Sequence, residues 1–277
     1  MTSSSSAASR ATDLAPALLP RRDPGRWLDP WLDLVHGGSC VGCAVPGASL
    51  CRACAAGLPA QALVVRPTPC PRGLAACFAA GEYADLLRAL VVAHKERAAY
   101  ALARPLGGLL AVSAGSALDP AARTLLVPVP SRPAVVRSRG HDPMLRVVRV
   151  AARRLRAEGS SVSVVRLLEQ RAVVRDQAGL DSSQRAANLA GSMTVRPAVR
   201  AALARSTEAV AVVVCDDVLT TGATAREAQR ALEESGLAVR AVATVAATRR
   251  LRVPGAGRPH DAVGPPGQAL PLCGAAD

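Results

Sequence analysis

The stretch VVVCDDVLTTGATARE (residues 212–227) decides the fold of this chain of 277 residues. An unbroken apolar run ends on two adjacent acids, Asp216 and Asp217, and a turn rich in threonine and glycine follows. An apolar run without polar alternation is typical of a strand buried on both faces of a parallel sheet. The stretch therefore predicts a strand, a tight turn and a helix of an α/β protein.

The turn has the composition of a phosphate-binding loop. In an open parallel sheet, ligands bind beyond the carboxyl ends of the strands. The helix that follows offers free N–H groups and the positive end of its dipole in its first turn, and a glycine lets the backbone approach a ligand closely. The candidate loop residues are Thr220, Thr221, Gly222, Ala223 and Thr224.

The acid pair suggests what the phosphate is attached to. Two carboxylates beside such a loop suit the hydroxyl groups of a ribose, or a Mg²⁺ ion that bridges them. We therefore expect Asp216 and Asp217 to bind and orient the sugar of a phosphosugar, while the loop binds its phosphate. The alternative interpretation is a plain strand, turn and helix with an acidic turn and a threonine–glycine cap.

The rest of the chain predicts more strands and helices in alternation. Strands are expected at residues 124–130, 161–168, 209–217 and 239–248. Helices are expected at residues 83–110 with a break near Pro105, at 223–235, and from Pro143 onward with Asp142 as N-cap. Residues 169–191 are polar and are expected to be mobile. The alternation implies a parallel sheet covered by helices on both faces.

Composition divides the chain into segments. Residues 1–26 are rich in serine and alanine and predict a disordered tail, and residues 251–277 predict a second one. A cysteine-bearing module at residues 27–60 precedes the main domain at residues 75–250. Between them the sequence RPTPCPRG (residues 66–73) indicates a linker or turn.

The cysteine module has the spacing of a metal knuckle. Cys40, Cys43, Cys51 and Cys54 form the pattern C-x2-C-x7-C-x2-C. Each pair can present two thiolates from one tight turn, and four thiolates complete a tetrahedral Zn²⁺ site without an open position for catalysis. The prediction is a structural zinc site; disulfide pairing is the alternative, which a reducing compartment disfavours.

The charge balance permits two interpretations. Thirty-four basic and 21 acidic residues give a net charge of +13, which is typical of a polyanion-binding surface. However, Lys95 is the only lysine, and such a preference for arginine also fits the codon bias of a GC-rich genome. The chain has neither an apolar run of roughly 18 residues nor a recognisable signal peptide, so we expect no membrane span and a cytoplasmic location.

One predicted helix carries an arginine stripe. Arg146, Arg149, Arg153 and Arg156 follow Pro143 at spacings that share one face, beside the apolar stripe of Leu145, Val148, Ala152 and Leu155. The arginines could follow a nucleic-acid backbone, or they could simply be solvated. Aromatic residues, on which single-stranded bases stack, make up only 2% of the chain. We therefore expect weak, salt-sensitive binding of single-stranded DNA, if any.

A second strand end supplies further phosphate-binding candidates. The strand TLLVPVP (residues 124–130) should end at the same edge of the sheet as the acid pair, and Ser131 and Arg132 follow it. Arginine is suited to bidentate contact with phosphate, so both residues could face a pyrophosphate. An ordinary exposed loop is the alternative.

Two resemblances emerge from these motifs. The stretch at residues 212–227 resembles the phosphoribosyl pyrophosphate (PRPP) signature of type I phosphoribosyltransferases, in which the two acids bind the ribose hydroxyls and the loop binds the 5-phosphate. Together with the four cysteines, the chain resembles the ComF family (ComFC-like proteins). The likeness extends from Cys40 to Thr248 and includes Arg139 and Gly140, while residues 141–143 depart from the family pattern. Further matches are Tyr83, Lys95, Gln177, Leu180, Arg185 and Asn188.

The resemblance implies a type I phosphoribosyltransferase fold that binds PRPP with Mg²⁺. It also implies a role in DNA uptake during natural transformation or in handling single-stranded DNA, with a competence helicase or a recombination mediator as partner. An active phosphoribosyltransferase, which transfers ribose 5-phosphate from PRPP to a nitrogenous base, is the alternative. No base-recognition segment can be identified, so the acceptor stays open.

Overall fold

A computed structural model describes residues 38–97, 99–131, 136–137, 142–171, 191–204 and 209–248. Both expected tails and nearly all of the segment expected to be mobile lie outside these residues. The described residues form a mixed α/β structure around a mostly parallel sheet. Within them, no helix has the length and apolar character that crossing a membrane requires.

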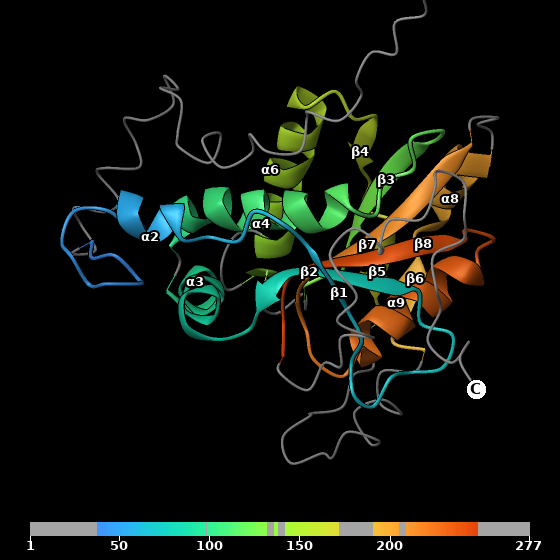
Figure 1. Ribbon diagram of the computed structural model, residues 1–277. Helices are drawn as coiled ribbons and strands as arrows, with labels where there is room; N and C mark the ends of the chain where they lie inside the picture. Colours follow the sequence, from blue (N-terminus) through green and yellow to red (C-terminus); the bar gives the residue numbers. More distant parts are fainter. Residues whose placement is uncertain are drawn as a thin grey trace, which may run out of the picture.

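The central sheet has six strands in the order β1-β2-β8-β7-β3-β4 (Figure 1). The strands are β1 (Leu63–Val65), β2 (Ala76–Glu82), β3 (Arg123–Pro128), β4 (Val162–Val164), β7 (Val210–Leu219) and β8 (Val239–Ala247). Only β1 runs antiparallel to its neighbour. Strand β8 is buried except at Arg240, and β7 is buried along the apolar run from Ala211 to Cys215, as that run predicts.

Helices cover both faces of the sheet. On one face lie α3 (Asp85–Glu96), α4 (Ala103–Gly115) and α6 (Pro143–Ala157), and on the other lies α9 (Ala223–Glu233) with a small antiparallel sheet of β5 (Leu168–Gln170) and β6 (Met193–Val195) (Figure 1). The shorter helices are α2 (Arg52–Ala56), η3 (Tyr100–Leu102) and α8 (Pro197–Ala204). Alternate residues of β7 bury into the two cores, Val213 and Cys215 into one and Val212 and Val214 into the other.

Several predicted elements are confirmed. The strands predicted at residues 124–130, 209–217 and 239–248 correspond to β3, β7 and β8, and the helix at 223–235 corresponds to α9. Asp142 caps α6, because its Oδ1 accepts a hydrogen bond of 3.2 Å from the backbone N–H of Leu145. Pro143 occupies the first helical position, where the missing N–H costs nothing.

The single helix predicted at residues 83–110 is wrong. The chain forms α3, then η3, then α4, and the break falls after Glu96 rather than near Pro105. Pro105 lies in the first turn of α4, where a backbone N–H would have no intrahelical partner. The break allows α3 and α4 to bury separate apolar faces in the same core.

The single strand predicted at residues 161–168 is also wrong. It is divided between β4, which extends the central sheet, and β5, which pairs with β6. The backbone N–H of Val165 still bonds to Leu126 of β3 at 3.1 Å, whereas the carbonyl of Leu167 accepts a 2.8 Å bond from Arg196. The chain therefore changes sheets within one largely apolar run, and the apolar pattern continues because both ends are buried.

Candidate functional site

The acid pair lies at the carboxyl end of β7. Strand β7 continues to Leu219, two residues beyond the predicted end, so Asp216 and Asp217 are its last polar residues. Both are partly buried, and the backbone N–H of Asp217 donates a 2.9 Å hydrogen bond to Asp216 Oδ1. Asp217 faces the α3 side of the sheet, where Lys95 lies.

The loop after the acids makes a left-handed turn directly into α9. Gly222 has a φ of 72°, which glycine adopts without steric cost, and it is the N-cap residue of the helix. Its carbonyl accepts a 2.8 Å bond from the backbone N–H of Arg226. Thr220 is exposed, and Thr221, Ala223 and Thr224 are partly exposed. The loop therefore presents hydroxyl groups and the start of a helix, the donor set that a phosphate requires.

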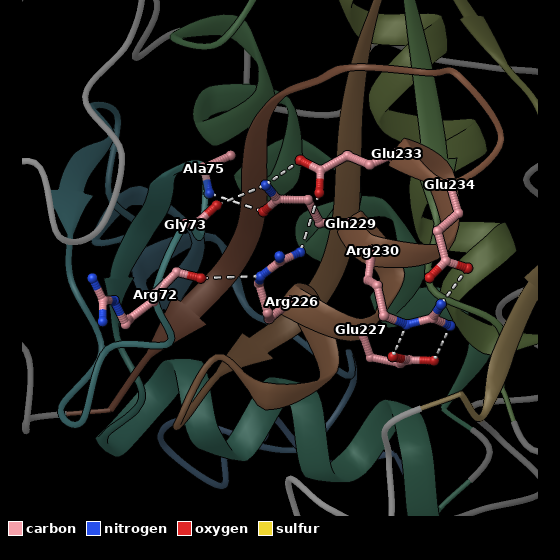
Figure 2. A network of polar contacts seen from close by, with 9 residues as sticks. All are labelled: Arg72, Gly73, Ala75, Arg226, Glu227, Gln229, Arg230, Glu233 and Glu234. Atoms are coloured by element: carbon pink, nitrogen blue, oxygen red, sulfur yellow. Dashed lines mark hydrogen bonds and ion pairs between the residues drawn. The ribbon is translucent and has the colours of Figure 1, made fainter.

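The proline-rich segment at residues 66–73 supports this loop from behind. A Cβ atom on Gly222 would lie 3.0 Å from both Pro67 Cγ and Leu74 Cδ2. Figure 2 shows how α9 holds the segment: Arg226 Nε donates to the carbonyl of Arg72 at 3.1 Å. Sequence analysis identified this segment only as a linker or turn. Its additional role is to buttress the loop.

Gln229 of α9 strengthens the same attachment. Its side-chain amide donates to the carbonyl of Gly73 at 2.8 Å and accepts from the backbone N–H of Ala75 at 2.9 Å (Figure 2). The same amide nitrogen also donates to Glu233 at 2.7 Å. Gln229 is buried, so these bonds satisfy polar groups that water cannot reach.

A second group of polar contacts attaches α9 to β6. Glu227 Oε1 accepts a 2.9 Å bond from the backbone N–H of Met193, and Arg230 donates to the Met193 carbonyl at 3.1 Å. Arg230 also pairs with Glu227 at 2.7 Å and with the exposed Glu234 (Figure 2). Burial disfavours the charged form of Glu227, but the bond from Arg230 outweighs it and lowers the pKa of Glu227.

Lys95 of α3 forms an ion pair with Asp217. The Lys95 side chain is 41% exposed and the Asp217 side chain 19%, so solvent reaches the pair from the lysine side. Partial burial opposes the charge on Lys95, but the carboxylate of Asp217 outweighs this and raises the pKa of the amine. The Lys95 ammonium is therefore the cationic partner of Asp217 at this strand end.

Asp216 has different electrostatic surroundings. Burial, followed by the negative charge of Asp217, raises the pKa of Asp216 to about 7, although Lys95 and the N–H of Asp217 favour its ionised form. The carboxyl group can thus carry a proton near neutral pH. The preceding residue, Cys215, is fully buried in the core among apolar neighbours. Burial raises the pKa of its thiol.

A small pocket opens on the α3 side of the acid pair. Asp217 and Lys95 line it together with the buried His94, and α3, α4, α6 and β8 supply the apolar remainder. Those remaining residues are Val91, Leu106, Pro143, Met144, Val147 and Val245. The ion pair is therefore adjacent to an apolar wall, where charges interact more strongly than in open water.

Ser131 lies at the edge of the sheet where the acid pair lies. Pro128 of β3 is opposite Cys215 of β7 in the parallel register, which brings the two strand ends together. The Ser131 hydroxyl donates to Asp142 Oδ1 at 2.9 Å, so it joins the cap of α6 in this structure. Arg132, the other pyrophosphate candidate, lies outside the described residues, as do Arg139, Gly140 and the four matches between Gln177 and Asn188.

The four cysteines form one compact cluster. The sulfur atoms of Cys40, Cys43, Cys51 and Cys54 all lie within 4.8 Å of one another, and all four are free thiols. Zinc–sulfur bonds of about 2.3 Å in a tetrahedron place the sulfurs about 3.8 Å apart, and the Cys43 and Cys51 sulfurs are 3.6 Å apart. The cluster therefore fits a metal ion such as zinc.

Backbone donors support the thiolate form of Cys40 in this cluster. The N–H of Cys51 points to the Cys40 sulfur at 3.3 Å, and the N–H of Cys54 points to the Cys51 sulfur at 3.4 Å. Burial opposes the Cys40 thiolate, but backbone N–H groups of Cys51, Cys43 and Gly42 outweigh it and lower the pKa of Cys40 to about 6. A thiolate is the form that ligates metal.

The arginine stripe of α6 is on the surface, as the spacing predicted. Arg146, Arg149, Arg153 and Arg156 are all exposed, while the apolar stripe of the same helix is buried. Arg146 stacks over the ring of Tyr100 with its guanidinium carbon 5.0 Å from the ring centroid. Arg156 donates to the Val162 carbonyl at 3.2 Å. An aromatic ring thus accompanies the stripe at one end.

No protein-family model matches this chain, and no curated protein matches it. The site is therefore described by its own geometry. The sequence predicted the acid pair, the loop and the cysteines, but it did not predict that Lys95 pairs with Asp217 or that the proline-rich segment supports Gly222. The presence of a single lysine is visible in the sequence and could have drawn attention to Lys95. That the prolines lie close to the loop is visible only in the fold.

Proposed function

We propose that this chain is a ComF-like protein with a type I phosphoribosyltransferase fold, and that it binds PRPP with Mg²⁺. The observation that carries the proposal is the geometry at the end of β7, where two adjacent acids lead directly to a positive-φ glycine at the start of α9. In the proposed complex, Asp216 and Asp217 accept hydrogen bonds from the ribose hydroxyls, and residues 220–224 donate to the 5-phosphate. Mg²⁺ would neutralise part of the pyrophosphate charge.

The proposed cellular role is the handling of single-stranded DNA during natural transformation, in the cytoplasm and with a competence helicase or a recombination mediator as partner. Two observations support a polyanion partner: the net charge of +13 and the exposed arginine stripe of α6. The family resemblance supplies the rest of this proposal. Binding along the stripe would be electrostatic and independent of sequence, because arginines contact phosphates without identifying bases.

An active phosphoribosyltransferase is the second candidate. It is favoured by the parallel register of β3 and β7, which brings the end of β3, where Ser131 lies, to the same edge as the acid pair. In that reaction the bond from the ribose anomeric carbon to pyrophosphate breaks and a bond to a base nitrogen forms. The acids would orient the ribose while positive charge develops on it.

A calorimetric titration with PRPP, with and without Mg²⁺, tests the proposal. We expect saturable binding that Mg²⁺ strengthens and that Asp216→Asn and Asp217→Asn each weaken by about tenfold or more, the loss of roughly one hydrogen bond to a charged group. Gly222→Ala should weaken binding as well, because the added Cβ strains the turn and meets Pro67 and Leu74. Gly236→Ala is the matched control, since Gly236 also has a positive φ, of 82°, but has open space around it.

The same titration separates the candidates. No binding at millimolar PRPP would contradict the proposal for the site. Binding without pyrophosphate release in the presence of a panel of bases would favour the DNA-handling role, and release would establish the transferase.

A further inference from the structure

The cysteine cluster and the acid pair lie at opposite ends of one helix. Helix α3 spans 12 residues, with Leu86 in its first turn and Lys95 in its last. At a rise of about 1.5 Å per residue these two positions are about 14 Å apart along the axis. Each end has a specific contact, Leu86 with the cysteine knuckle and Lys95 with Asp217.

The contact at the first turn is tight. A Cβ atom on Gly42, between the first two cysteines, would lie 2.8 Å from Leu86 Cδ1 and 2.9 Å from the Cys54 sulfur. Leu86 and the Cys54 thiol therefore both lie against the side of Gly42 where a Cβ would stand, and they leave no space for even a methyl group. Any displacement of the knuckle must displace Leu86 or open a gap, and close-packed interiors resist both.

Neighbouring residues extend this contact. Val41 and Leu50, which flank cysteines of the knuckle, pack against the core that contains α3. Beyond the cluster, Pro59 and Leu87, a residue of α3, both lie close to Gly81. A Cβ atom on Gly81 would lie 3.2 Å from Pro59 Cγ and 3.0 Å from Leu87 Cδ2. The knuckle is thus continuous with the packing around the first turn of α3.

We propose that the metal held by Cys40, Cys43, Cys51 and Cys54 fixes the position of α3 and thereby holds Lys95 against Asp217, so that metal content controls the acid pair. Without metal, only hydrogen bonds such as that from the Cys51 N–H to the Cys40 sulfur join the two cysteine pairs, and the knuckle can open. Leu86 then loses its support and α3 can shift as a rigid rod. The resulting displacement at Lys95 lengthens the ion pair, and Asp217 loses its fixed cation.

The consequence for PRPP affinity rests on the proposed function, but the coupling itself does not. Lys95 is the only lysine in the chain, so protein labelled with ε-¹³C-lysine gives one side-chain NMR signal from Lys95. Its chemical shift at fixed pH reports whether the amine contacts a carboxylate. Asp217→Asn supplies the reference shift for a Lys95 without its ionic partner.

The experiment compares this signal in zinc-loaded and chelated protein under reducing conditions. We expect chelation to move the signal at least halfway toward its position in Asp217→Asn, and added zinc ions to reverse the change. An unchanged Lys95 signal in zinc-free, folded protein would overturn the proposal. Collapse of the whole fold on chelation, followed by circular dichroism, would also overturn it, because the metal would then be a general stabiliser rather than a support of α3.

A variant isolates the helix contact while the metal ligands stay intact. Leu86→Ala should retain zinc, measured by atomic emission, and still move the Lys95 signal toward the reference. Leu118→Ala is the matched control, since Leu118 is a partly buried leucine that packs on the same core beyond α4. A zinc-loaded Leu86→Ala protein with the wild-type signal would contradict the coupling.

PRPP titrations of the same samples give an independent result. If the wild-type protein fails to bind PRPP, the proposed function fails, while the lysine signal still decides the coupling. If it binds, we expect chelation to weaken binding in the wild-type protein and to have less effect in Lys95→Met.

Discussion

At the scale of single residues, Asp216 and Asp217 are adjacent in sequence but differ in their surroundings. Asp217 has the cation of Lys95 beside it, whereas Asp216 is affected most by burial and then by the like charge of Asp217. The carboxylates are therefore suited to different tasks. Asp217 has a fixed cationic partner, and Asp216, whose pKa is raised to about 7, can accept a proton or a hydroxyl hydrogen bond.

This difference predicts how stability depends on pH. The pKa of Asp216 is about 7 in the folded protein and 3.8 ordinarily, so the folded state retains a proton that the unfolded state loses between about pH 4 and pH 7. The folded state binds more protons in that window, and the free energy of unfolding therefore falls as pH rises through it. Asp216→Asn cannot ionise and should be more stable than the wild-type protein at pH 8, by about 1 to 3 kcal/mol.

Urea unfolding at pH 5 and pH 8 measures this difference. The stability gain of Asp216→Asn should grow between the two values, whereas Asp119→Asn, which removes a carboxylate paired with Arg240 at 3.2 Å on the surface, should show no such growth. Equal gains at both pH values would show that Asp216 is ionised throughout.

The acid pair and Gly222 could be predicted because all the necessary information lies within a few residues of one strand end. An apolar run, two acids and a glycine specify a local geometry that the rest of the fold did not change. Lys95 could not be assigned to Asp217, because the two are far apart in the chain and the pairing depends on how α3 packs over β7. That Lys95 is the only lysine could draw attention to this residue, but it could not identify the residue with which it pairs.

At the scale of elements, α9 connects three parts of the chain. Its start forms the loop, and Arg226 and Gln229 hold the proline-rich segment (Figure 2). Glu227 and Arg230 hold β6. These contacts are polar and lie on the face of a helix whose apolar side packs on the sheet. The orientation of the loop therefore depends on hydrogen bonds as well as on the hydrophobic core.

Glu227 accepts a hydrogen bond from β6, and removing its carboxylate should destabilise this part of the fold. Glu227→Ala leaves the backbone N–H of Met193 and the guanidinium of Arg230 without this carboxylate, and we expect it to lower the free energy of unfolding by about 1 to 3 kcal/mol. Glu234→Ala, which removes the more exposed partner of the same arginine, should change it by less than about 1 kcal/mol. Amide hydrogen exchange should also quicken at Met193 in Glu227→Ala only. Similar effects of both variants would mean that Glu227 contributes only a surface ion pair.

Elements with strong patterns were predicted, and elements defined by packing were not. The capped helix at Pro143 and the strands β7 and β8 follow from caps and apolar runs. Strand β2, with the sequence ACFAAGE, was missed because alanine has no strand preference of its own and the segment becomes a strand only by pairing with β8. The division of residues 161–168 between two sheets was missed for a related reason, since both environments bury apolar side chains.

At the scale of the whole molecule, the parallel register brings distant parts of the sequence to one edge. Strand β8 lies between β2 and β7, so the last strand of the described chain joins the first parallel strand to the strand of the acid pair. The cysteine module, which composition set apart as a separate segment, packs on the core that also contains α3 (Figure 1). Contacts of this kind are non-local, and a single sequence contains no signal for them.

The charge of the molecule gives a final prediction about single-stranded DNA. Arg149 and Arg153 are exposed neighbours one turn apart on α6, and each phosphate that an arginine neutralises on a single strand contributes about 0.7 to the slope of log affinity against log salt. Arg149→Ala with Arg153→Ala should therefore reduce that slope by about 1.4. Arg154→Ala on the same helix, where Arg154 is paired with Glu158 at 3.0 Å, should leave it nearly unchanged. A fluorescence-anisotropy titration with oligothymidylate at several salt concentrations measures the slopes of both variants. An unaltered slope in the double variant would place any DNA contact elsewhere and show that the arginine stripe is simply solvated.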